Sequence, residues 1–138
     1  MRGSTNLPFT AAAALNIGDV VYLSAADTAA KSNTPANYQK FLGVVVGGKA
    51  TYGYVGTLST DVGVSAAATG ESVLVQRNGK AWVVADAAIV AGALLTQGAT
   101  TAGRVDDSAS ATQGQIIGLA LQAATNAADK ILMLIGHR

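Results

Sequence analysis

The chain has 138 residues, enough for one domain with a modest core, and half of it is apolar. Charged residues make up only 12%, the formal net charge is +1, and there is no cysteine. This composition excludes disulfide scaffolds and cysteine-ligated metal sites, and the scattered Lys and Arg residues argue against a nucleic-acid partner. A surface so poor in charge is typical of a chain whose faces are covered by other subunits or by a partner.

The first segment, residues 1–12, has no hydrophobic periodicity and contains Pro8. We expect an extended N-terminal arm in which Leu7, Pro8 and Phe9 contact a partner; a disordered terminus is the alternative. Deleting residues 2–10 should then abolish that contact and leave the fold intact. We expect no signal peptide, because polar residues interrupt the apolar ones here. The longest strongly apolar run, residues 131–135, is far shorter than the about 20 residues that span a membrane.

Runs of β-branched, aromatic and other apolar residues predict a mainly β domain over residues 13–138. Ala-rich segments could form single helical turns at residues 11–15 and 85–91. Polar or Gly-rich segments predict loops, with a long loop or a small extra hairpin at 48–65. The predicted strands are residues 20–23, 41–46, 72–77, 80–84, 92–96, 104–105, 116–121 and 130–135.

Asn78-Gly79 lies between two apolar runs and predicts a β-hairpin with a two-residue turn. In that register one face is fully apolar and belongs in a core. The other face is mixed, and Leu74 and Val83 on it would meet a subunit or partner. The residues of the first face are Val73, Val75, Trp82 and Val84.

Three pairs of segments match in order and spacing, which predicts a domain built from two similar halves, residues 13–84 and 87–135. Residues 13–24 resemble 87–98, residues 41–46 resemble 116–121, and residues 67–75 resemble 123–134. In this alignment residues 48–65 are an insertion in the first half.

Chemical signatures are weak. Residues 43–49 fit the G-x-x-x-x-G-K part of a phosphate loop, but Ala50 stands where a hydroxyl should reach magnesium, and the valine run favours a strand. His137 is the only histidine and lies in a polar tail. Asp106 and Asp107 are adjacent, so they would point to opposite faces, and we interpret them as loop residues that aid solubility. We expect no catalytic, metal or cofactor site.

Aromatic residues are few, and half of the tyrosines, Tyr52 and Tyr54, fall in the 48–65 segment. Tyrosine is favoured at protein interfaces, so these two residues are candidates for a subunit or partner contact. A plain solvent-facing loop is the alternative. Trp82 is interpreted as a core residue of the central hairpin.

The order of these pieces resembles the phage capsid decoration (cement) proteins of the small lambda-like type. The resemblance rests on residues 17–21, 42–44, 68–75, 92–95, 103–105 and 117–121, which carry its glycines and short strands. The second half departs from it at Ala93, where an aspartate is expected after Gly92.

The resemblance implies a small β-barrel or β-sandwich-like domain with a structural, non-enzymatic role. Such a protein binds the major capsid protein on the outer surface of an icosahedral shell, as a homotrimer at local three-fold positions, after assembly in the host cytoplasm. It needs no cofactor, nucleic acid, membrane or small-molecule substrate. The alternative is a tube- or fibre-forming subunit of a virion or surface layer. A third possibility, a ligand-binding or enzymatic β-barrel, needs a polar cluster inside the sheet, and the sequence shows none.

Overall fold

The computed structural model describes residues 6–32, 40–52, 54–107 and 116–136. The described chain is mainly β, with short 3-10 turns and no α-helix among these residues, which confirms the predicted fold class. The elements are β1 (Asn6–Ala11), β2 (Leu15–Asn16), β3 (Val20–Ala25), β4 (Thr28–Lys31), β5 (Phe41–Gly48), η2 (Lys49–Thr51), η3 (Ser59–Asp61), β6 (Ser65–Ala67), β7 (Ser72–Gln76), β8 (Gly79–Val84), β9 (Leu94–Gln97), β10 (Val105–Asp107), β11 (Gly118–Ala120) and β12 (Lys130–Ile135).

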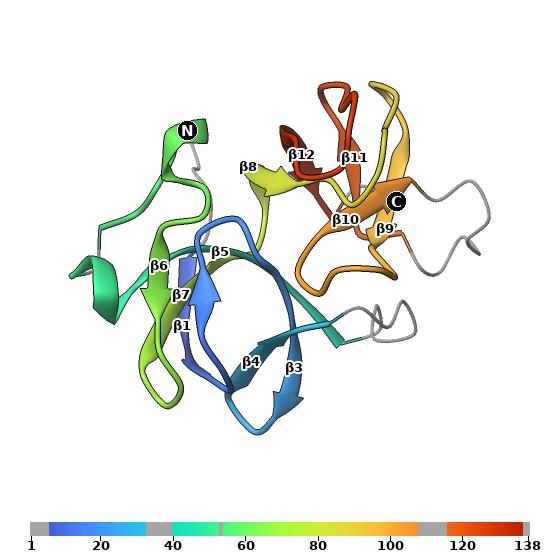
Figure 1. Cartoon of the computed structure of the whole chain (residues 1–138). Helices are drawn as coiled ribbons and strands as arrows, with labels where there is room; N and C mark the ends of the chain where they lie inside the picture. The colour runs from blue at the N-terminus through green and yellow to red at the C-terminus, as the bar shows by residue number, and fades with distance from the viewer. Residues whose placement is uncertain (1–5, 33–39, 53, 108–115, 137–138) are drawn as a thin grey trace.

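The first half of the chain forms a closed barrel with the strand order β1-β4-β3-β5-β7. Strand β1 closes it, because β1 pairs antiparallel with β7 and parallel with β4. The short β2 and β6 pair with each other beside the barrel. Figure 1 shows this half on one side of the molecule, in blue and green. A small barrel confirms the architecture expected from the sequence.

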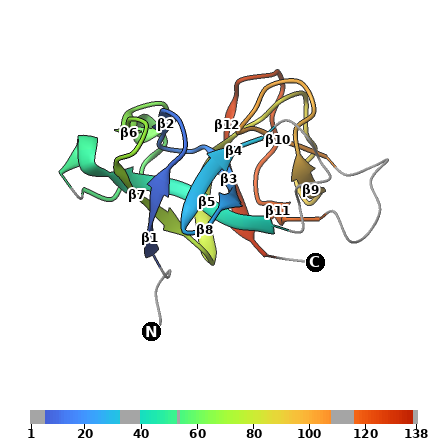
Figure 2. The same ribbon diagram turned by 90° about the horizontal axis from the view of Figure 1, so that it is seen from below.

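The second half forms a five-stranded sheet with the order β10-β9-β11-β12-β8. One parallel bridge, Ala85↔Val105, joins the two outer strands of this sheet at one end. Viewed from below, β5 of the barrel runs across the molecule and one of its ends lies near β11 of the second half (Figure 2). The second sheet is therefore closed less completely than the barrel.

Strand order and register repeat between the halves when β1, β3, β4, β5 and β7 are matched with β8, β9, β10, β11 and β12. Pro8 faces Leu74 as Trp82 faces Leu132. In the same way, Val21↔Gly43 corresponds to Leu95↔Gly118. These registers support the two similar halves inferred from the sequence. The halves begin at β1 and β8 and not, as expected, at residues 13 and 87, because β8 pairs within the second sheet.

Strands β3 and β5 are a wall shared by two hydrophobic clusters, because their side chains alternate between opposite faces. Val20 and Val44 pack with the second sheet, whereas Val21 and Val45 pack inside the barrel. All four are buried. Burial on both faces explains why these strands read as unbroken apolar runs in the sequence.

The expected N-terminal arm is, from Asn6 to Ala11, a strand of the barrel; residues 1–5 lie outside the described residues. Phe9 packs against the barrel core, and Leu7 is half-buried opposite Val75. Deleting residues 2–10 would therefore remove the closing strand and not leave the fold intact. The physical reason is that the barrel needs a partner for the free edge of β7.

The predicted hairpin at Asn78-Gly79 is wrong. Both edges of β7 are occupied, by β1 and by β5, so β8 leaves the barrel and pairs with β12. Gly79 has a φ of 82°, but Asn78 is not among the residues with positive φ, as a type I′ turn would need. Val83 is consequently buried in the core of the second sheet and offers no surface to a partner.

Several smaller expectations also change. Residues 28–31 form β4 where a loop was expected, and Asp106 and Asp107 lie in β10. No helical turn forms at 11–15 or 85–91; isolated strand bridges occur at Ala85 and Ile89. Residues 41–48 are a strand, so residues 43–49 are not a phosphate loop. His137 lies outside the described residues.

Candidate docking surface

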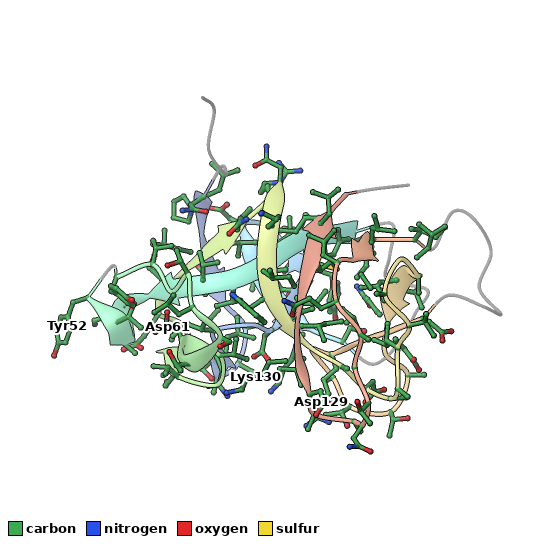
Figure 3. The ribbon with its side chains drawn as sticks, turned by 90° about the horizontal axis from the view of Figure 1, so that it is seen from above. Tyr52, Asp61, Asp129 and Lys130 are labelled. Atoms are coloured by element: carbon green, nitrogen blue, oxygen red, sulfur yellow. The ribbon has the colours of Figure 1, made fainter. Side chains whose placement is uncertain are left out.

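Four of the seven exposed large apolar side chains of the described residues lie in the loop between β5 and β6, residues 49–64, called here the insertion loop. Tyr52 is 99% exposed, and Tyr54, Leu58 and Val64 are 54%, 60% and 47% exposed. Figure 3 shows Tyr52 at one end of the molecule, pointing away from it. The loop thus presents an aromatic and aliphatic tip to the surroundings.

Hydrogen bonds fix the backbone of the tip. Thr51 Oγ1 accepts from Gly48 N–H at 3.1 Å and lies 2.9 Å from the carbonyl oxygens of Gly48 and Tyr54, either of which can accept its proton. Tyr52 N–H donates to Lys49 O at 3.0 Å and closes the 3-10 turn η2. All of these hydrogen bonds lie within the protomer, so the turn can form without a partner.

The base of the insertion loop is fastened to the barrel. Asp61 Oδ2 accepts from Leu58 N–H at 3.0 Å and lies 3.5 Å from the Tyr54 hydroxyl. Gly56 N–H donates to Val46 O at 2.7 Å. A Cβ on Gly47 would collide with the Tyr54 carbonyl, so glycine is needed where the loop crosses β5. The loop therefore packs closely onto the strand from which it leaves.

Charged side chains lie in and beside the insertion loop. Lys49 Nζ lies 3.8 Å from Glu71 Oε2, and Glu71 Oε1 accepts from Ala68 N–H at 2.9 Å. The pair is partly exposed, so it contributes little to stability, and with Asp61 the three side chains carry a net charge of −1. The exposed side chains of the tip, Tyr52, Tyr54 and Leu58, are uncharged.

Two shallow hollows flank the insertion loop. One, of about 380 Å³, is lined by Gly48, Lys49, Tyr52, Ser72 and Leu74. The other, of about 310 Å³, lies against β8 and β12. Its lining residues are Gly56, Thr57, Gln76, Lys80, Ala81, Trp82 and Leu132.

Some residues chosen from the sequence meet here. Tyr52 and Leu74 line the same hollow, and Pro8 lies directly opposite Leu74 on β1. Tyr54 follows in the same loop. Leu58 and Val64 were missed, because their exposure depends on the turn η3, which leaves no periodic signal in the sequence.

A polar hollow of about 230 Å³ lies at the joint of the two halves, and Asp19, Lys31 and Arg104 contribute to its lining. Burial raises the pKa of Asp19, while the Asn16 N–H and the charges of Lys31 and Arg104 act in the opposite direction. Asp19 Oδ2 accepts from Asn16 N–H at 2.8 Å. Its neighbour across the joint, Gly103, accepts from Val20 N–H. These groups connect the halves.

The pKa of Asp106 on β10 is also raised, first by burial and then by the carboxylates of Asp107 and Asp86, while the Asp107 N–H lowers it. Asp86 accepts from the N–H groups of Thr100 and Thr101 and so orders the loop after β9. Within the described ranges, no three His, Cys, Asp or Glu side chains are placed to hold a metal ion. Over the same ranges, no helix is long and apolar enough to cross a membrane.

The comparisons with known proteins agree with this picture. The chain matches, over residues 2–134, the family described as "Structural cement protein (E217 gp24/Pam3 gp6)". Among solved structures it is similar to the crystal structure of the head fiber gp8.5 N base in bacteriophage phi29. The identity is 15%, the TM-score is 0.58, and the match covers 97% of this chain and 95% of that chain. No curated protein matches.

A mainly β chain with little charge, a projecting apolar loop and this family match is a structural protein of a phage virion. It belongs to the family of phage structural cement proteins, because the match spans nearly its whole length. The likeness to the phi29 head fibre base concerns the fold alone.

Proposed function

We propose that this chain is a non-enzymatic protein that binds the major capsid protein on the outer surface of an icosahedral phage shell and stabilises the shell. The observation that carries the proposal is the cement-family match over residues 2–134. The low charge of the chain supports it, because apolar surface contributes about 25 cal/mol per Å² when a partner covers it.

The finer part of the proposal is a homotrimer at local three-fold positions, assembled in the host cytoplasm before it joins the virion. Three linked copies can hold several capsid subunits at once, and such multivalency adds avidity without any single strong contact. Of the contacts expected from the sequence, Pro8, Tyr52, Tyr54 and Leu74 remain candidates because they reach the surface. Leu7 and Phe9 serve the barrel instead.

The test uses expanded, DNA-free capsids that lack this protein. Purified chain should co-sediment with them to a fixed stoichiometry and raise the temperature at which the shells disassemble. Native mass spectrometry of the free chain should show a discrete trimer. Absence of binding would overturn the proposal, and a free chain that forms rings or filaments would favour the tube or fibre subunit.

A further inference from the structure

We propose that the insertion loop is the element that anchors the protein to the capsid, with the Tyr52 ring entering an apolar hollow of the capsid protein. This inference rests on the proposed function and names the contact through which it acts. Four observations support it: the absence of the loop from the second half, the conformation of Tyr52, the fixed shape of the loop, and its chemistry.

The second half shows that the loop is not needed to connect the strands. There, β11 and β12 are joined by residues 121–129, whereas residues 49–71 join β5 and β7. Both connections end in the same carboxylate-capped turn: Glu71 accepts from Ala68 N–H, and Asp129 accepts from Thr125 and Asn126 N–H. Part of the longer connection belongs to the fold, because β6 pairs with β2 and its Ala66 and Ala67 pack in the barrel core. No described residue from Lys49 to Asp61 is buried, so this exposed part is free to serve another purpose.

Tyr52 has a φ of 54° and a ψ of 36°, in the left-handed region that disfavours side chains. Its ring is 99% exposed, so side-chain packing offsets neither that strain nor the exposure of the ring. Glycine or asparagine would suit this backbone better. A tyrosine that costs stability at a fixed, projecting position is explained if a partner covers it.

The loop holds its shape before binding. The Thr51 hydroxyl contacts the Tyr54 carbonyl oxygen, and the Asp61 carboxylate accepts from Leu58 N–H. Gly56 N–H donates to Val46 O of the barrel. A preformed element loses little conformational entropy on association, which strengthens binding for a given contact area. The backbone that carries Tyr52 is therefore fixed, and only the rotamer of the exposed ring remains to be selected when a partner covers it.

The chemistry of the tip indicates its partner. Lys49 is paired with Glu71, and the Asp61 carboxylate faces Leu58 N–H at the base of the loop, so the exposed tip itself carries tyrosine and leucine. Such a surface is complementary to an apolar hollow in a protein, and Tyr is enriched among the residues that dominate interfaces. Since cement proteins act on the shell, we assign the hollow to the capsid protein and not to a second copy of this chain.

The decisive variant is Tyr52→Asn, which removes the ring and keeps a residue that tolerates the left-handed backbone. Val90→Asn is the matched control, because Val90 is 74% exposed and lies in the second half. Tyr52→Phe is the conservative variant. All three are compared with the unaltered chain for co-sedimentation with expanded capsids, for native mass and for melting temperature.

We expect Tyr52→Asn to weaken capsid binding by about 30-fold, as the loss of a central interface residue does. Its native mass should be unchanged and its melting temperature equal or higher. Val90→Asn and Tyr52→Phe should bind within about 3-fold of the unaltered chain. Raising the salt from about 0.05 M to about 0.5 M should change the affinity little, because the anchoring contact is made by the uncharged Tyr52 ring.

The outcomes separate the two proposals. If the unaltered chain does not bind, the proposed function fails. If it binds and Tyr52→Asn binds equally well, the function stands and the anchor inference is overturned. If Tyr52→Asn dissociates the free oligomer, the loop is a contact between copies, which also overturns the inference.

Discussion

The two halves of the molecule share one strand order and one register, but they differ in how completely the sheet closes and in the loops that they carry. In the barrel, β1 and β4 meet along Thr10↔Thr28 and Ala11↔Ala29, whereas in the described part of the second half the matching strands β8 and β10 are joined by the bridge Ala85↔Val105. The barrel also carries the insertion loop. We interpret the features that both halves share as requirements of the fold. Features found in one half alone are the better candidates for a role in function.

The outer faces differ in the same way. The cross-strand pair Pro8–Leu74 of the barrel is replaced in the second sheet by Trp82–Leu132. Gln76, the last residue of β7, is replaced by Leu134. Gln76 is polar because the chain must turn there from the barrel into β8, a task that Leu134 near the end of the second half does not have.

The largest expected effect concerns Gly43 and Gly118, which occupy the same register position. A Cβ on Gly43, whose φ is 152°, would collide with the Gln76 carbonyl, part of the backbone of β7. A Cβ on Gly118 would lie 2.6 Å from Met133 Sδ, on a flexible side chain, and 2.8 Å from Leu134 O. We expect Gly43→Ala to cost about 4 kcal/mol or more. Gly118→Ala should cost about 1–3 kcal/mol.

Urea unfolding followed by Trp82 fluorescence checks this pair. If Gly43→Ala yields no soluble protein, soluble expression at low temperature replaces the unfolding curve as the readout. Equal losses for the two variants would show that the two glycines are not under different constraints.

The next-largest expected effect concerns the crossing between the halves, residues 77–78, where the chain passes from β7 of the barrel to β8 of the second sheet. Gln76 is buried, and its Nε2 donates to Asn78 O at 2.8 Å and to Lys80 O at 2.7 Å. Gln76→Leu copies the residue of the second half and leaves these carbonyls without that donor. We expect a loss of about 1–3 kcal/mol in the free energy of unfolding. Leu134→Ala, as a control, should act by lost packing alone, and an unchanged stability of Gln76→Leu would mean that the side chain does not fasten the crossing.

A smaller, reciprocal effect is expected at the capped turns. Gly70 has a φ of 82°, and Ala128, at the matching position in the strand connection of the second half, has a φ of 73°. Each N–H donates to the matching carbonyl, Ala11 O or Ala85 O. Nothing lies within 4 Å of a Cβ on Gly70, so Gly70→Ala should cost only the backbone strain, about 1 kcal/mol. Ala128→Gly should gain up to about 1 kcal/mol.

Thermal unfolding of the two variants tests the equivalence of these turns. Opposite shifts in melting temperature are the expected result. Shifts of the same sign would show that the turns differ in backbone conformation despite their shared hydrogen bonds.

The sequence allowed most strands to be predicted, because β3, β5 and β12 bury large apolar side chains in runs or alternation. Strand β4 escaped because Ala29 and Ala30 give no such signal. Strand β1 escaped because Pro8 is usually a strand breaker. Ala11 N–H donates to Glu71 O, and in an antiparallel pair every second residue of a strand forms such hydrogen bonds with its neighbour. Position 8 therefore lies between two hydrogen-bonded pairs of β1 and β7, where no N–H is needed.

The candidate site was predicted in part for a similar reason. Tyr52 could be chosen from residue type and from its place in an insertion, and Leu74 from alternation along its strand. The pairing of Asn78-Gly79 could not be judged locally, because whether the turn closes a hairpin depends on which strands already occupy the edges of β7. Competition between distant strands for the same edge of β7 cannot be recognised in a short stretch of sequence.

The smallest effect concerns Asp19, where the second half has Ala93. Because burial raises the pKa of Asp19 in the folded chain, the folded state binds its proton more tightly than the unfolded state does. The contribution of Asp19 to stability is therefore greatest below the ordinary carboxyl pKa of about 4 and declines as the pH rises through the raised value. Asp19→Asn should remove this decline, since its amide oxygen can still accept from Asn16 N–H.

Urea midpoints of the unaltered chain and Asp19→Asn, measured from about pH 4 to about pH 7, isolate the Asp19 contribution. Asp106, whose pKa is also raised, remains in both proteins and cancels in the difference. Ala93→Asp, which places a carboxylate at the matching turn of the second half, should add a decline of the same sign. If Asp19→Asn keeps the full pH dependence, the joint between the halves is more hydrated than the burial of Asp19 implies, and the two halves are joined mainly by the apolar wall of β3 and β5.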